Sequence, residues 1–99
     1  MKILWLRAAT QDLGELFDYL LDRDPGAALA IFETIQAQVA RLADYPGMGR
    51  PGRVEDTREL VINQTAYIVA YTVDTRRDAV IVLRVLHSAR RWPEQFEQQ

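Results

Sequence analysis

The chain has 99 residues, of which 48% are hydrophobic, and its formal net charge is −2. This length predicts one domain, residues 1–99, with a single core between two layers of secondary structure, and the apolar share excludes a disordered chain. The lack of cysteine excludes disulfides and thiolate metal sites, and one histidine weighs against a zinc site, so we expect no metal and no cofactor.

The basic residues are unevenly distributed. Residues 1–49 carry four bases and seven acids, whereas residues 50–99 carry eight arginines and seven acids, and residues 79–93 contain no acid at all. This balance excludes a protein that coats polyanions, so any anionic contact would be local. No apolar run is long enough to act as a signal peptide or to span a bilayer, which favours a cytoplasmic location without membrane contact.

The first half of the chain predicts a short strand and two helices. Residues 2–6 form the strand. Apolar residues then recur at helical spacing and form one stripe: Leu13, Leu16, Phe17, Leu20 and Leu21. Asp24-Pro25 is an N-cap followed by a proline that starts the second helix, which should reach about Asp44 before a Pro-Gly-rich turn. The short link predicts an antiparallel helical hairpin.

The second half predicts three strands, at residues 58–62, 66–73 and 79–87, because these runs are rich in β-branched and aromatic residues. Short polar loops between them predict an antiparallel meander. Residues 90–96 are expected to form one helical turn. The predicted fold class is therefore α+β, with the helical hairpin packed on the meander.

If the loops set the strand register, Val73 lies opposite Ala79 and Ile62 opposite Ala66. Both faces of the sheet are then apolar, and the single hairpin covers only one of them. The other face should bind a partner protein. That face carries Arg58 together with the residues that we predict to bind the partner: Leu60, Ile62, Ile68, Val80, Val82, Arg84 and Leu86.

Several segments of the chain match one known family. These are Gly49-Arg50-Pro51, Thr57-Arg58-Glu59-Leu60-Val61, the run from Ala66 to Tyr71 and the run from Leu83 to Arg90. With the order of elements, they resemble the RelE/ParE superfamily of type II toxins over nearly the whole chain. The resemblance implies a hetero-oligomer with a cognate, ParD-like antitoxin, which alone would contact operator DNA.

The branches of this superfamily differ in activity. RelE-like members cut messenger RNA on the ribosome with cations placed along the sheet, whereas ParE-like members inhibit DNA gyrase. Where RelE nucleases carry lysines and an arginine, this chain carries Glu59, Val61 and Ile68, and Ser88 stands near the last cationic position. The resemblance is therefore closer to ParE, and it implies a toxin that binds gyrase and blocks DNA replication without catalysing a reaction.

Three alternatives guide the choice of candidate residues. In the gyrase reading no residue is catalytic, and the basic aromatic segment after the last strand would bind the target: Arg90, Arg91 and Trp92. In the alternative, a RelE-type ribosome-dependent endoribonuclease, the catalytic set would be Arg58, Arg84, His87 and Arg90. A third reading is a protein that has lost toxicity and serves only as an antitoxin-binding subunit.

Several of these residues could instead have a purely structural role. A lone histidine at a strand end more often packs than catalyses. Arg84, among valines and leucines, would pair with a carboxylate such as Glu59 or with an acid of the antitoxin. Tyr67, Tyr71 and Trp5 would belong to the core, and Trp92 could fold back onto the sheet.

Overall fold

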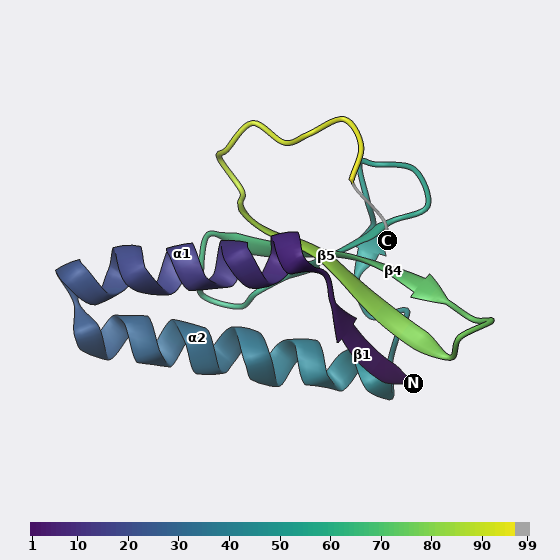
Figure 1. Ribbon diagram of the computed structural model, residues 1–99, viewed down its shortest axis with the longest axis horizontal. Coiled ribbons are helices and arrows are strands. Elements are labelled where there is room, and N and C mark those ends of the chain that lie inside the picture. The colour runs from purple at the N-terminus through teal and green to yellow at the C-terminus, as the bar shows by residue number, and fades with distance from the viewer. Residues whose placement is uncertain (97–99) are drawn as a thin grey trace.

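The computed structural model describes residues 1–96 and shows two helices packed on one face of a mixed five-stranded sheet (Figure 1). This confirms the predicted α+β fold. The elements follow in this order: β1 (Lys2–Trp5), α1 (Arg7–Arg23), α2 (Pro25–Ala40), a 3₁₀ turn η1 (Arg41–Ala43), β2 (Arg50–Pro51), β3 (Arg58–Val61), β4 (Tyr67–Asp74) and β5 (Ala79–His87).

The helical hairpin forms where the sequence predicts it. The Asp24 carboxylate accepts a hydrogen bond of 3.2 Å from the backbone N–H of Ala27, so Asp24 is the N-cap of α2. The two helices meet through an edge-to-face contact of Phe17 and Phe32, whose ring centroids lie 5.6 Å apart. The apolar stripe of α1, apart from the exposed Leu21, thus faces α2 and the sheet.

The strands are ordered β1-β5-β4-β3-β2, and β1 runs parallel to β5 while the other neighbours are antiparallel. Strand β2 was not predicted, because its two residues lie within the Pro-Gly-rich turn. It pairs Arg50 with Glu59 and Pro51 with Arg58. This short pairing fixes the turn against the outer edge of β3.

The predicted strand register is wrong by one residue in two places. Val61 pairs with Ile68, so β3 is turned over relative to the expectation. Val73 pairs with Val80 and not with Ala79, so the first half of β5 is turned over as well. Because side chains alternate across a strand, a shift of one residue exchanges the two faces.

A β-bulge explains why the predicted facing of side chains is wrong in the first half of β5 and right in the second half. Ala70 pairs with Arg84 but Tyr71 pairs with Val82, which leaves Leu83 as the extra residue. Beyond the bulge, Val85 and His87 lie on the same face as Tyr67, as expected. A loop-based register has no means of anticipating a bulge within the strand.

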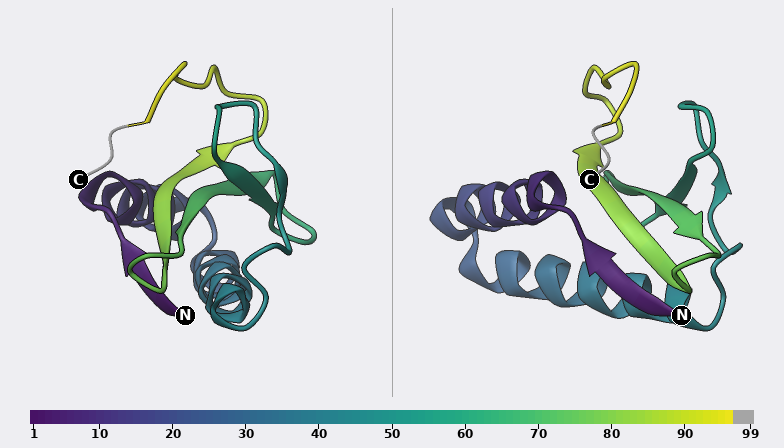
Figure 2. Two further views of the ribbon diagram at one scale, coloured as in Figure 1. Left: turned by 90° about the vertical axis from the view of Figure 1, so that its right-hand side faces the viewer. Right: turned by 45° about the vertical axis from the view of Figure 1, so that its right-hand side comes forward.

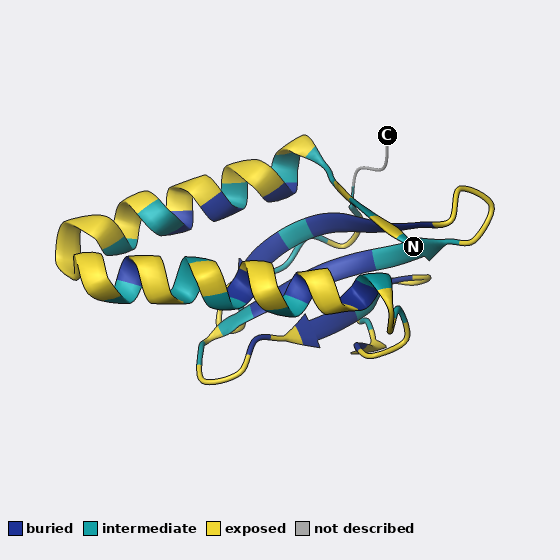
Figure 3. Cartoon of the chain, turned by 90° about the horizontal axis from the view of Figure 1, so that it is seen from below, coloured by how far each residue is buried: buried dark blue, intermediate teal, exposed yellow. Residues whose placement is uncertain are grey.

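The corrected register changes which predicted partner-binding residues are accessible. Four of these residues are buried in the core with residues of the two helices: Leu60, Ile62, Val80 and Val82. The expectation that they lie on the uncovered face of the sheet is therefore wrong. Figure 3 shows this core as the buried strand segments beneath the helices. The other three residues, Ile68, Arg84 and Leu86, lie on β4 and β5 away from this core cluster.

The face away from the helices is not the open apolar surface that we expected. Ile68 and Leu86 are only 4% and 3% exposed. Residues 50–57 and 88–96 lie on this side of the sheet (Figure 2). The chain thus covers much of its second face with its own loop and C-terminal segment.

The predicted helical turn at residues 90–96 is absent, and this segment has no regular structure. The indole N–H of Trp92 donates a hydrogen bond of 3.2 Å to the carbonyl of His87, and the N–H of Arg90 donates to the same oxygen. Pro93 has no N–H to continue a helical ladder. These contacts turn the segment back over the sheet, as the structural reading of Trp92 expected.

Candidate functional site

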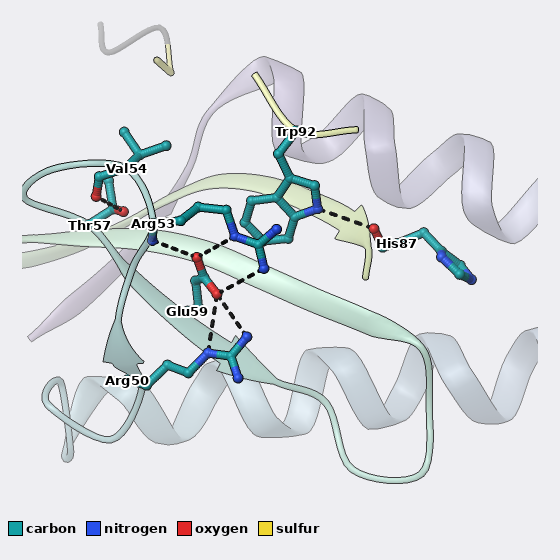
Figure 4. Close-up of polar contacts among 7 residues, drawn as sticks. All are labelled: Arg50, Arg53, Val54, Thr57, Glu59, His87 and Trp92. Atoms are coloured by element: carbon teal, nitrogen blue, oxygen red, sulfur yellow. Dashed lines mark hydrogen bonds and ion pairs between the residues drawn. The ribbon is translucent and has the colours of Figure 1, made fainter. Parts of the chain in front are cut away.

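A buried carboxylate organises the loop that follows the helices. Glu59 on β3 is 3% exposed and accepts hydrogen bonds from two arginine side chains (Figure 4). Arg50 donates through Nε at 3.2 Å and through Nη2 at 2.9 Å to one oxygen. Arg53 donates through Nε at 3.1 Å and through its backbone N–H at 2.8 Å to the other. Both oxygens of Glu59 are therefore occupied.

Trp92 completes this group. The guanidinium carbon of Arg53 lies 3.7 Å from the centroid of the Trp92 ring, which is a cation–π contact. One edge of the guanidinium faces Glu59 and one face contacts the indole (Figure 4). We call Arg50, Arg53, Glu59 and Trp92 the arginine cluster. It joins the turn, β3 and the C-terminal segment.

The cluster keeps Glu59 ionised. Burial by itself would raise the pKa of Glu59, but the hydrogen bond from the Arg53 backbone and the hydrogen bonds from the two guanidinium groups outweigh burial, so the pKa lies below its ordinary value of 4.5. The predicted Glu59–Arg84 pair is not formed. Glu59 binds two other arginines instead, because β2 places Arg50 opposite it and Arg53 follows two residues after that strand.

Arg84 has a different partner, Asp12 on α1. Its Nε and Nη2 donate to the Asp12 carboxylate at 2.7 and 3.0 Å, and the backbone N–H of Val85 donates to the same carboxylate at 2.9 Å. The hydrogen bond to Asp12 raises the pKa of Arg84 despite burial. The pair fixes α1 against the part of β5 that extends beyond its pairing with β1.

Next to this pair, a groove of about 430 Å³ runs between α1 and the end of the sheet. Its lining includes Glu15, Tyr19, Tyr67, His87 and Arg90. The rings of Tyr67 and His87 meet edge to face with centroids 5.3 Å apart. Burial raises the pKa of Tyr67, and the nearby Tyr19 adds to this. The groove brings together aromatic rings, one arginine and acids.

Arg58 lies in another part of the molecule. It donates a hydrogen bond of 2.7 Å to the carbonyl of Gly49, and it lines a separate hollow with Thr57 and Thr72. It does not line the groove that contains His87 and Arg90. Of the four residues named for a nuclease, His87 and Arg90 thus line one groove, and Arg84 and Arg90 line an adjoining hollow.

Tyr71 anchors the Pro-Gly-rich turn from inside the core. Its hydroxyl donates to the carbonyl of Pro46 at 2.7 Å and accepts from the N–H of Gly49 at 2.8 Å. A Cβ atom at Gly49 would lie 2.7 Å from that hydroxyl, so only glycine fits there. The core assignment of Tyr71 is confirmed, and burial raises the pKa of its hydroxyl.

Two of the three residues predicted to bind the target, Arg90 and Arg91, are exposed, whereas Trp92 is half-buried. The sequence analysis missed Asp12 and the pairing of Arg50 and Arg53 with Glu59. Asp12 lies 72 positions from Arg84, so no local pattern could show that pair. For the contacts of Glu59, the sequence did offer a signal: two arginines in the turn precede a glutamate on the next strand.

Comparison with known proteins places this fold in a family. Residues 3–92 match the family described as ParE toxin of type II toxin–antitoxin system, parDE. The chain is 40% identical over 93 residues to "Putative toxin Y4kP" of Sinorhizobium fredii, covering 94% of each chain. It is 34% identical over 85 residues to "Toxin RelE3" of Caulobacter vibrioides, covering 84% of this chain and 89% of that one.

A solved structure agrees with these relatives. The chain superposes on a protein of the chromosomal ParDE toxin–antitoxin system from P. aeruginosa with a TM-score of 0.78 and 27% identity, covering 88% of this chain and 95% of the other. Among residues 1–96, no helix is both long and apolar enough to cross a membrane. From the family match and the high identity, the chain belongs to the ParE toxins of type II toxin–antitoxin systems within the RelE/ParE superfamily.

Proposed function

We propose that this toxin inhibits DNA gyrase by binding it in the cytoplasm, traps gyrase on broken DNA and so blocks replication and arrests growth. The observation that carries the proposal is that two of the candidate catalytic arginines in this ParE-family chain are bound to other groups of the protein. Arg58 is bound to the carbonyl of Gly49 and Arg84 to Asp12, so neither guanidinium is free to stabilise a phosphorane beside His87. Arg90, Arg91 and Trp92 remain the proposed target contacts.

A cognate ParD-like antitoxin is the proposed neutralising partner, and it would supply the contacts to operator DNA. The helical hairpin supports an antitoxin contact, because Tyr19, Leu21 and Leu29 are 54%, 41% and 53% exposed. Arg84 stays a proposed antitoxin contact. Ile68 and Leu86 would become available only if the antitoxin displaced residues 88–96.

The test is a plasmid assay with purified toxin, gyrase and supercoiled DNA. We expect covalent gyrase–DNA complexes to accumulate with the wild-type chain and less with Arg91→Gln, because Arg91 is exposed and can contact the target. Arg76→Gln, an equal charge change in the β4–β5 loop, is the matched control. Absence of any inhibition by the wild type would remove the proposal.

The alternative is a ribosome-dependent endoribonuclease, favoured by the groove that joins His87, Arg90 and Tyr67. Mapping of messenger ends in cells that express the toxin separates the two functions. Codon-phased cuts that disappear in His87→Ala would establish cleavage. Harmless expression without antitoxin would instead indicate a subunit that has lost toxicity.

A further inference from the structure

The arginine cluster holds two guanidinium groups in fixed positions at the surface. The side chains of Arg50 and Arg53 are 54% and 45% exposed, although both are anchored on a carboxylate that is 3% exposed. Surface arginines normally lose conformational freedom when they bind a ligand. Here Glu59 has already restricted both side chains, so less of that cost remains.

Each guanidinium is engaged on one edge only. Arg50 uses Nε and Nη2 on Glu59, and Arg53 uses Nε and Nη2 on the same carboxylate. Within residues 1–96, the Nη1 atoms of both arginines have no hydrogen-bond partner, and the exposed Glu55 and Asp56 of the same loop form no ion pair with either. The second edges therefore remain available as donors.

The charge balance of the cluster suits an anion. Two guanidinium groups and one ionised carboxylate leave one net positive charge, and the low pKa of Glu59 maintains this balance at neutral pH. The Trp92 ring covers one face of Arg53 and restricts the orientation of its planar fork. A planar fork held in this way matches the bidentate geometry of a carboxylate.

Extended polyanions fit the surroundings less well. Glu55 and Asp56 lie two and three residues after Arg53 in the loop, Glu94 lies two residues after Trp92, and the whole chain is negative. A nucleic acid would bring its repeated phosphates against these acids, whereas a single carboxylate meets only the two arginines. The local charge pattern thus favours a protein carboxylate.

We propose that the arginine cluster is a preorganised binding site for a carboxylate side chain of a partner protein, with Arg50 and Arg53 as the donors and Glu59 and Trp92 as the residues that position them. This site is separate from the groove lined by His87 and Arg90. It does not depend on whether gyrase is the target.

The first test is a binding titration of the full chain with a short synthetic peptide that carries a single glutamate among glycines and has both ends blocked, followed by NMR of the arginine Nε–H signals. We expect saturable shifts at Arg50 and Arg53. Arg50→Gln and Arg53→Gln should each weaken binding about tenfold, the effect of losing one charge-assisted hydrogen bond. Arg76→Gln should leave binding unchanged. No saturable shifts, unchanged binding in both cluster variants, or an equal loss in Arg76→Gln would overturn the site.

The second test separates positioning from simple charge. Glu59→Gln makes the cluster more positive but removes the carboxylate that fixes both guanidinium groups. Preorganisation predicts that this variant binds the peptide more weakly than the wild type, whereas simple charge attraction predicts tighter binding. Tighter binding by Glu59→Gln would therefore refute the positioning role. Stronger binding of a single-stranded oligonucleotide than of the peptide at the same arginines would overturn the choice of a protein carboxylate.

Discussion

At the scale of single residues, polar side chains connect segments that are distant in sequence. Asp12 holds Arg84 and caps the Val85 N–H, while the Tyr71 hydroxyl holds both Pro46 and Gly49. Each of these groups satisfies backbone donors or acceptors that a loop or strand edge leaves open. The loops are therefore positioned by specific hydrogen bonds from helices and strands.

Tyr71→Phe isolates one such contact. The variant keeps the ring in the core but removes both hydrogen bonds of the hydroxyl, and it leaves the buried N–H of Gly49 without its partner. We expect a loss of about 2 kcal/mol in the free energy of unfolding, measured by urea denaturation. Tyr45→Phe, at a tyrosine that is 61% exposed, should change it little. Equal stability of Tyr71→Phe and the wild type would contradict the role of the hydroxyl.

At the scale of elements, strand register decides which residues form the core. The β5 bulge and the shifted β3–β4 pairing turn Leu60, Ile62, Val80 and Val82 toward the helices. Apart from β2, the strands were predicted within one residue of their observed ends, because composition indicates a strand. Register depends on pairing across the sheet, and neither composition nor loop length determined it here.

Substitutions at two adjacent positions of β3 test this register. Leu60→Asp places an unpaired charge in the core and should cost about 4 kcal/mol or more in the free energy of unfolding of the isolated chain. Val61→Asp, at a side chain that is 44% exposed, should cost far less. Thermal unfolding of both variants is the measurement. A tolerated Leu60→Asp together with an unfolded Val61→Asp would restore the register predicted from the loops.

At the scale of the whole molecule, the chain covers both faces of its sheet. The helices cover one face, and residues 50–57 with residues 88–96 lie over the other. The arginine cluster is the polar connection that joins these last two segments to β3 (Figure 4). Its ionisation therefore links pH to the packing of the whole second face.

The pH dependence of stability follows from the sign of the Glu59 shift. Its pKa is lower in the folded chain than its ordinary value of 4.5, so the folded state holds the proton less tightly than the unfolded state. The stabilisation from Glu59 is fully present above pH 4.5 and is lost as the pH falls through the lower folded-state pKa. Urea denaturation across acidic pH should show this loss in the wild type and a flatter profile in Glu59→Gln. Glu55→Gln, in the same loop but exposed, should keep the wild-type profile. A wild-type profile in Glu59→Gln would show that another group is responsible.

The sequence alone determined the classes of element, the capped start of α2 at Asp24, the strand segments and the family resemblance, because periodicity, capping residues and β-branched composition act over a few neighbouring residues. Only the tertiary structure decided the strand faces, the pairing of Asp12 with Arg84 and the arginine cluster around Glu59. These features depend on a bulge, on a two-residue strand and on contacts between residues far apart in the chain. These contacts stabilise the protein only once the distant segments have come together, so no local sequence pattern indicates them.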